Sequence, residues 1–399
     1  MQRRNFLKHL SVFPTLSLIE SLRANEDELK RNGKSAILLW MGGGPSTMDI
    51  WDLKPGAPTG GPFRPINTSG DVQICEHMPL MAKQMHNAAI IRSMSTREAD
   101  HMRGRYYMHT GYVPNPNMTH PSYGSVISHQ LQRPEVSIPK FISVGGGSMG
   151  AGFLGAKYSP FVVNSDGRIR NLDMKVDQRF YQRAYALDAI ESGFINQRRG
   201  SAAKEHQAIL KEAFNVLTSS QMDALKVAGE PENVKERYGN NGFGKGCLMA
   251  RRLVEAGVPF IEVNLGGWDN HQNIHPILRD TKLPMLDQGM SALFEDLEQR
   301  GLIDDTVVIW MGEFSRTPRI NQNAGRDHWA RSWSVVVGGG GMNGGISIGE
   351  TNSDGTRVET EPHTSQDVMA SVCKALGISL GTTFTSNNGR PMKIANSGK

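Results

Sequence analysis

The sequence has little cysteine, no phosphate-binding loop and no long apolar run. Cys75, Cys247 and Cys373 are its only cysteines in 399 residues. Their odd number and wide spacing exclude a disulfide framework and a zinc knuckle, so we expect buried free thiols, with one disulfide after export as the alternative. The glycine run 42–44 is not followed by Gly-Lys-Ser/Thr, which excludes a P-loop.

Runs of basic residues interleaved with aromatics are also absent, although the pI is about 9.0 and the formal net charge is +5. Without residues 1–24, which hold four basic side chains and one acidic one, the formal charge falls to +2. The rest of the chain is close to balanced. We therefore expect no nucleic-acid partner.

The first 24 residues carry Arg3 and Arg4, followed by Phe-Leu-Lys at positions 6–8. This pattern resembles a twin-arginine export signal and predicts a periplasmic or secreted protein. An ordinary amphipathic helix with two exposed arginines is the alternative. The apolar stretch Leu10–Ile19 is interrupted by a proline and is shorter than the ~20 residues of a spanning helix. The sequence therefore predicts no integral membrane segment.

Length and composition, with 38% hydrophobic and 21% charged residues, fit one large α/β domain over residues 35–399. We expect a helical insert at about 170–245 and a small β appendage near 340–362. Apolar runs predict strands at Lys34–Met41, Ala88–Arg92, Lys140–Val144, Phe260–Leu265, Thr306–Met311 and Ser334–Val337. Helical spacing and caps predict helices from Ser122 to Gln132, over Cys247–Ala256 and over Leu283–Arg300, and a last helix that opens with residues 363–367 and runs to Leu376.

Carboxylates and imidazoles follow two of these strands directly. Asp269 and His271 come after Phe260–Leu265 and share a side if the chain stays extended, and Glu313, Asp327 and His328 follow Thr306–Met311. Buried parallel strands deliver polar groups to a cleft in this way. With no thiolate among them, the set suits Zn, Mn or Fe. Carboxylates that only cap the next helices are the alternative.

Several of these segments carry a family resemblance. The passage LEQRGLIDDTVVIWMGEF, residues 297–314, resembles a passage of sulfatases and other members of the alkaline phosphatase superfamily. The motifs WDNH, GEFSRTPR, GRDHW and ARRLVEAG resemble the sulfatase-like bacterial family called domain of unknown function 1501. The resemblance starts at about Ser35. It implies an alkaline-phosphatase-like, mainly parallel sheet sandwiched by helices, a divalent metal with Zn or Mn favoured over Ca, and a small phosphate or sulfate ester as substrate.

The chain departs from the superfamily pattern at three positions, one of which is Phe314, where histidine or asparagine is usual. The first strand ends in glycines where a metal-binding aspartate is expected, so Asp49 either reaches the metal or caps a short turn with Ser46. His101 stands where the nucleophile is expected. It could act as a metal ligand, a general acid or base, or a phosphoryl acceptor, and a purely structural histidine is the alternative. Arg105 and Arg316 are candidate anion clamps and, with His101, the candidate catalytic residues.

The sequence thus favours an exported metal-dependent hydrolase that acts on an anionic ester through a metal-activated water. A catalytically eroded binding protein on the same fold is the alternative. A true sulfatase is disfavoured because Met102, Arg103 and Gly104 interrupt the C/S-x-P-x-R motif. No pattern in the sequence points to an oligomeric state.

Overall fold

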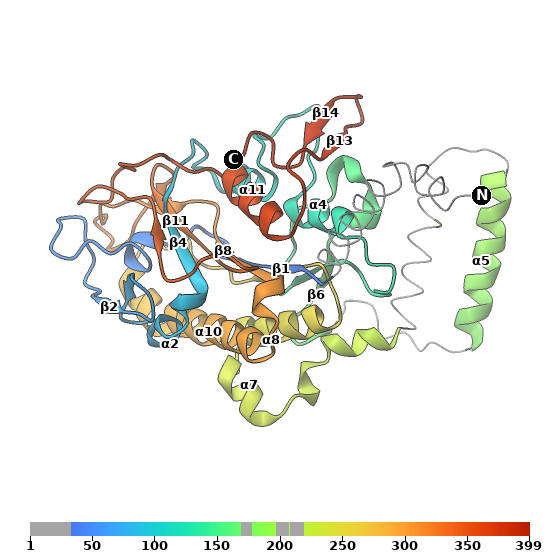
Figure 1. The fold of residues 1–399 in the computed structure, drawn as a ribbon, viewed down its shortest axis with the longest axis horizontal. Coiled ribbons are helices and arrows are strands. Elements are labelled where there is room, and N and C mark those ends of the chain that lie inside the picture. Colours follow the sequence, from blue (N-terminus) through green and yellow to red (C-terminus); the bar gives the residue numbers. More distant parts are fainter. Residues whose placement is uncertain (1–32, 169–177, 197–206, 208–218) are drawn as a thin grey trace, which may run out of the picture.

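A computed structural model describes residues 33–168, 178–196, 207 and 219–399 (Figure 1). The twin-arginine segment lies outside these residues, so its role stays a prediction. Within the described ranges, no helix is both long enough and apolar enough to cross a bilayer.

One eight-stranded sheet forms the centre of the molecule. In spatial order its strands are β12 (Ser347–Ile348), β4 (Ala88–Met94), β11 (Trp333–Gly339), β8 (Thr306–Met311), β1 (Ser35–Trp40), β7 (Phe260–Asn264), β5 (Phe141–Val144) and β6 (Phe161–Val163). Neighbouring strands run parallel except at β11, which is antiparallel to both β4 and β8. The predicted class, a mainly parallel sheet, is confirmed.

The central strands are continuous apolar runs because both faces of the sheet are covered. Every residue of β1 and β8 is buried. Alternate residues of β1 enter two different cores: Ile37 and Leu39 pack with α8 (Gly242–Glu255) and α10 (Leu283–Gln299), whereas Ala36 and Leu38 pack with α3 (His101–Thr110), α4 (Tyr123–Gln130) and α11 (Ser365–Ala375). Figure 1 shows α8 and α10 below the sheet and α4 and α11 above it.

Smaller elements complete the described chain. The short helices are α2 (Pro79–Ala82), α7 (Glu232–Tyr238), α9 (Ile274–Ile277), the π-helical turn η7 (Leu278–Lys282), and 3-10 turns at Thr47–Asp49, Met85–Asn87, Gly152–Leu154, Ala156–Tyr158, Ser220–Leu225, Val227–Gly229 and Ile303–Asp305. Three two-stranded sheets pair β2 (Pro65–Asn67) with β3 (Gln73–Cys75), β9 (Ser315–Arg316) with β10 (His328–Trp329), and β13 (Thr383–Thr385) with β14 (Pro391–Lys393).

Two of the predicted segments differ from their expected form. The small β appendage expected near 340–362 is part of the main sheet, because β12 pairs in parallel with β4 and the Ile90 amide donates to the Ile346 carbonyl at 3.0 Å. The predicted insert at 170–245 lies partly outside the described residues, and its boundaries stay a prediction. Its helix α5 (Gln178–Asn196) stands apart from the sheet at the right of Figure 1, and its Tyr185 is 80% exposed.

The cysteines are free and buried, as expected from their spacing. Burial raises the pKa of the Cys75 and Cys373 thiols to about 12 and also raises the pKa of Cys247. Each of them is therefore a small apolar core residue and not a reactive thiol.

Candidate metal centre

The loops that follow β1, β7 and β8 meet at the carboxyl edge of the sheet. Gly43 makes this meeting possible: its φ is +113°, and a Cβ there would lie 2.7 Å from the Asp269 nitrogen and 2.8 Å from that of Trp268. The Trp268 amide donates to the Gly42 carbonyl at 3.2 Å, and its buried indole nitrogen donates to Leu265 at 2.8 Å. Asp269 is therefore held at the strand end by the backbone on either side.

A short hairpin brings the second predicted motif to the same place. Strands β9 and β10 pair antiparallel with Arg316 opposite His328. The sequence predicted that Glu313 and His328 would belong to one site but not how the chain brings them together. The hairpin does so, because after the loop 317–327 it returns the chain to the end of β8.

Helix α3 supplies the third element. It begins at His101, and the Asp100 side chain caps it by accepting from the Arg103 amide at 3.0 Å. Gly104 lets the helix lie on the β8 loop, since a Cβ there would already be 3.0 Å from the Phe314 ring and 3.2 Å from Glu313 Cβ. The first turn of α3 therefore faces the strand ends.

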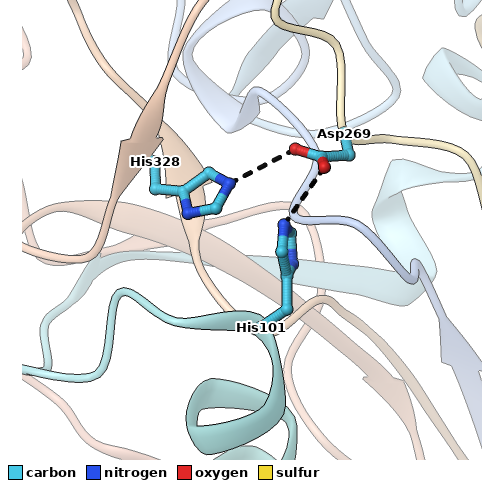
Figure 2. Close-up of side chains that lie close together, drawn as sticks. All are labelled: His101, Asp269 and His328. Carbon is cyan, nitrogen blue, oxygen red and sulfur yellow. Dashed lines mark hydrogen bonds and ion pairs between the residues drawn. The ribbon is translucent and has the colours of Figure 1, made fainter.

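Three side chains converge at this point (Figure 2). His101 Nε2 lies 3.3 Å from Asp269 Oδ2, and His328 Nε2 lies 3.3 Å from Asp269 Oδ1. One ligand atom from each of His101, Asp269 and His328 lies within 4.8 Å of the other two. Three protein ligands of this kind are typical of catalytic zinc sites, whereas structural zinc sites have four.

The partners of the two imidazoles orient their Nε2 atoms toward Asp269. His101 Nδ1 lies 2.7 Å from Glu313 Oε1, and His328 Nδ1 lies 3.0 Å from the Ala99 carbonyl. Because both oxygens accept, each Nδ1 carries a proton and each Nε2 is left to bind a proton or a metal ion. His101 Nε2 is buried and has no hydrogen-bond partner among the described residues. The donor set therefore fits a divalent cation.

Charge around the cluster favours a cation in the same way. The pKa of His101 is raised, first by its hydrogen bond to Glu313 and further by the charges of Glu313 and Asp269, although burial opposes the shift. At Asp269 burial raises the pKa, but the charge and hydrogen bond of Arg316 outweigh it and hold the pKa at about 2. Asp269 is thus an anion at any physiological pH.

The other residues predicted for the site contact this cluster or lie near it. His271 Nε2 is 2.9 Å from Asp269 Oδ1, and His271 Nδ1 is 2.7 Å from Asp327 Oδ1. Arg316 is buried and reaches Asp269 Oδ1 at 2.6 Å. One turn along α3 from His101, Arg105 donates through Nη2 to the Gly147 carbonyl, and its buried Nε has no partner in the described chain.

Asp49 is the predicted ligand that the structure does not bring to the cluster. Its oxygens accept from Arg326 Nε at 2.8 Å and Nη2 at 3.0 Å, and Ser46 donates to it at 2.6 Å. His275 Nε2 lies 3.2 Å away on the same carboxylate. Of the two alternatives from the sequence, the turn with Ser46 is the one observed, because a buried arginine occupies both oxygens.

Sequence reasoning treated Phe314 only as a departure from the superfamily pattern and gave no role to Asn321. The Phe314 ring lies 5.0 Å from that of His101 and 4.9 Å from that of His328, so it supports both imidazoles. Asn321 donates to Asp327 Oδ1 at 3.2 Å and to the His271 carbonyl at 3.1 Å. The sequence does not show that Phe314 packs on two imidazoles, and an asparagine in a loop is ordinary.

Fold and site together define an α/β protein with a candidate metal centre at the carboxyl ends of parallel strands. The chain belongs to the family described as "Protein of unknown function (DUF1501)", whose model matches residues 33–399. The predicted family is thereby confirmed. Among curated proteins, none matches this chain.

Solved structures that match this chain include a member of the alkaline phosphatase superfamily, an alkaline phosphatase and a sulfatase. A member from Vibrio parahaemolyticus is 12% identical, with a TM-score of 0.36, covering 87% of this chain and 67% of its own. Alkaline phosphatase from the Antarctic bacterium TAB5 is 12% identical, with a TM-score of 0.38 and coverage of 87% and 98%. The PsFucS1 sulfatase from Pseudoalteromonas sp. is 11% identical, with a TM-score of 0.38 and coverage of 90% and 70%. Likeness at this level transfers no residue role or activity.

Proposed function

We propose that this protein is an exported, metal-dependent hydrolase of phosphate or sulfate esters. The observation that carries the proposal is the convergence of His101 Nε2, His328 Nε2 and the Asp269 carboxylate, with each Nδ1 fixed by an oxygen acceptor. Two imidazoles and one carboxylate suit Zn or Mn better than Ca, which prefers oxygen ligands. The substrate class rests on the resemblance of residues 297–314 to sulfatases and phosphatases.

The residues of the site divide the work of such a reaction. A divalent cation held here supplies Lewis acidity toward a water molecule and an ester oxygen. Glu313 and the Ala99 carbonyl keep His101 and His328 in the tautomer that presents Nε2. Asp269 keeps its negative charge because Arg316 lowers its pKa. Arg105, near the start of α3, is the arginine we propose to meet the anionic group of the substrate.

Attack by water agrees with the side chains present. The described side chains that pair with Asp269 are His101, His271, His328 and Arg316. None of them is a hydroxyl or a thiol, and His101, the phosphoryl acceptor considered above, belongs to the proposed ligand set. We therefore propose direct hydrolysis without a covalent ester on the enzyme.

Metal content decides the proposal. Protein purified without added metal or chelator is expected to contain stoichiometric Zn or Mn by mass spectrometry and to hydrolyse p-nitrophenyl phosphate or p-nitrophenyl sulfate. His328→Ala is expected to lose both properties. His86→Ala is the matched control, since His86 also pairs with a carboxylate, Glu298 at 3.2 Å, on the surface.

Histidine variants are preferable to Asp269→Ala in this test. Loss of Asp269 removes the only carboxylate among the described residues that forms an ion pair with the buried Arg316 guanidinium, and breaking a buried pair costs on the order of 3–5 kcal/mol. A folded wild-type protein without metal contradicts the proposal. A protein that contains the metal but hydrolyses no ester favours the alternative function, a binding protein on the same fold.

A further inference from the structure

Asp269 has two neighbouring places where a cation can contact its carboxylate. The first, which we call the histidine position, lies among His101 Nε2, His328 Nε2 and the Asp269 oxygens. The second, the guanidinium position, lies among Asp269 Oδ1, His271 Nε2 and the carbonyls of Gly43 and Gly44. In the second position the protein places its own cation, the side chain of Arg316.

Arg316 is completely enclosed and its donors are engaged. The side chain has no exposed surface. Nε donates to the Gly44 carbonyl at 2.7 Å, and Nη2 donates to the Gly43 carbonyl and contacts Asp269 Oδ1 at 2.6 Å. Nη1 lies 3.3 Å from His271 Nε2. An arginine bound in this way is held too firmly inside the protein to clamp an incoming anion, the role that its sequence position suggested.

His271 forms one wall of the guanidinium position. Its Nδ1 lies 2.7 Å from Asp327 Oδ1, and its Nε2 lies 2.9 Å from Asp269 Oδ1 and 3.3 Å from Arg316 Nη1. The guanidinium therefore contacts both Asp269 and His271 and fills the place in which a second cation would meet them.

We propose that Arg316 is a permanent cation in the guanidinium position, so that the centre takes a single divalent ion, in the histidine position. This inference rests on the proposed function and reassigns three residues. His271 Nε2 faces Arg316, Asp327 holds His271 through Nδ1, and Glu313 holds His101 through Nδ1. These three side chains position the centre without binding its metal.

The test is a titration of the metal-free protein with Zn²⁺ alone, in competition with a zinc-binding dye, which gives stoichiometry and affinity without any substrate. The wild-type chain is expected to bind one ion. His271→Ala is expected to bind one ion with affinity within about tenfold of wild type, whereas His328→Ala weakens binding by more than the ~100-fold upper range for a lost outer partner.

Variants of Arg316 test the guanidinium position directly. Arg316→Ala frees Asp269 Oδ1, His271 Nε2 and two carbonyls, so its capacity is expected to rise to two ions per chain. Arg316→Lys keeps the positive charge and is expected to restore a capacity of one. The comparison of His271→Ala with His328→Ala decides the matter even if Arg316→Ala fails to fold.

The outcomes separate this inference from the proposed function. Two ions in the wild-type chain, or equal losses in His271→Ala and His328→Ala, overturn the role of Arg316 and leave a metal-dependent hydrolase standing. A folded Arg316→Ala protein that still binds one ion also overturns it. A wild-type chain that binds no Zn²⁺ overturns both proposals.

Discussion

Replacing Glu313 with glutamine is expected to weaken metal binding about tenfold. The Glu313 side chain is 4% exposed, and its Oε1 accepts from His101 Nδ1 at 2.7 Å and from the Gly43 amide at 2.9 Å. Glutamine keeps an acceptor in this place but removes the charge. Hydrogen bonds to charged groups contribute about 1.5–3 kcal/mol and neutral ones about 0.5–1.5. The difference of about 1.4 kcal/mol is tenfold in a dissociation constant.

The titration is best done at about pH 8, where protons compete little for imidazole. Glu298→Gln is the matched control, because it removes a carboxylate–imidazole contact of the same kind at 3.2 Å on the surface. Its Zn²⁺ affinity is expected to equal that of wild type. A folded Glu313→Gln protein with unchanged affinity refutes the argument that this carboxylate orients His101.

Three further predictions concern stability and export. Burial raises the pKa of Asp287 to about 6 from 3.8, so the stability that this carboxyl contributes is complete below about pH 4 and is lost as pH rises through 6. As pH rises from 4 to 7, the free energy of unfolding of Asp287→Asn, measured in urea, should increase relative to that of wild type by up to about 3 kcal/mol. Arg251 is 2% exposed and pairs with Glu230 and Glu255 at 2.7 Å, so Arg251→Ala should lower the unfolding free energy by about 3–5 kcal/mol, and a loss below about 1 contradicts this. Arg3→Lys with Arg4→Lys should keep the protein in the cytoplasm by cell fractionation, and unchanged export rules out the twin-arginine route.

The sequence predicted the sheet well because the central strands are defined by local pattern. Thr306–Met311 is apolar or β-branched throughout, ends at Gly312, and forms β8 over these same residues. Leu283–Arg300 was predicted as a helix from its apolar face, and α10 ends one residue earlier, before the Gly301 turn. Both elements are specified by residues that adjoin one another along the chain.

The site could be predicted only as a gathering of polar strand ends. The rule that parallel strands end at one edge of the sheet brought Asp269 and His328 together in the prediction. It gave no information about which oxygen or nitrogen each side chain would face. Asp49 pairs with Arg326 across 277 residues of sequence, and no local pattern encodes that contact. The contacts of Arg316 with the Gly43 and Gly44 carbonyls depend likewise on the path of the loop at Gly43.

Asp269 has two separate roles in this structure. It is a candidate metal ligand and also the counter-charge of an arginine that the fold encloses completely. A related protein that no longer bound a metal would still need this aspartate, or a joint replacement of it and Arg316, to remain folded. Conservation of Asp269 among related proteins would therefore reflect the stability of the fold. The histidines at 101 and 328 have no such structural role, so substitutions there would be the first sign of a changed function.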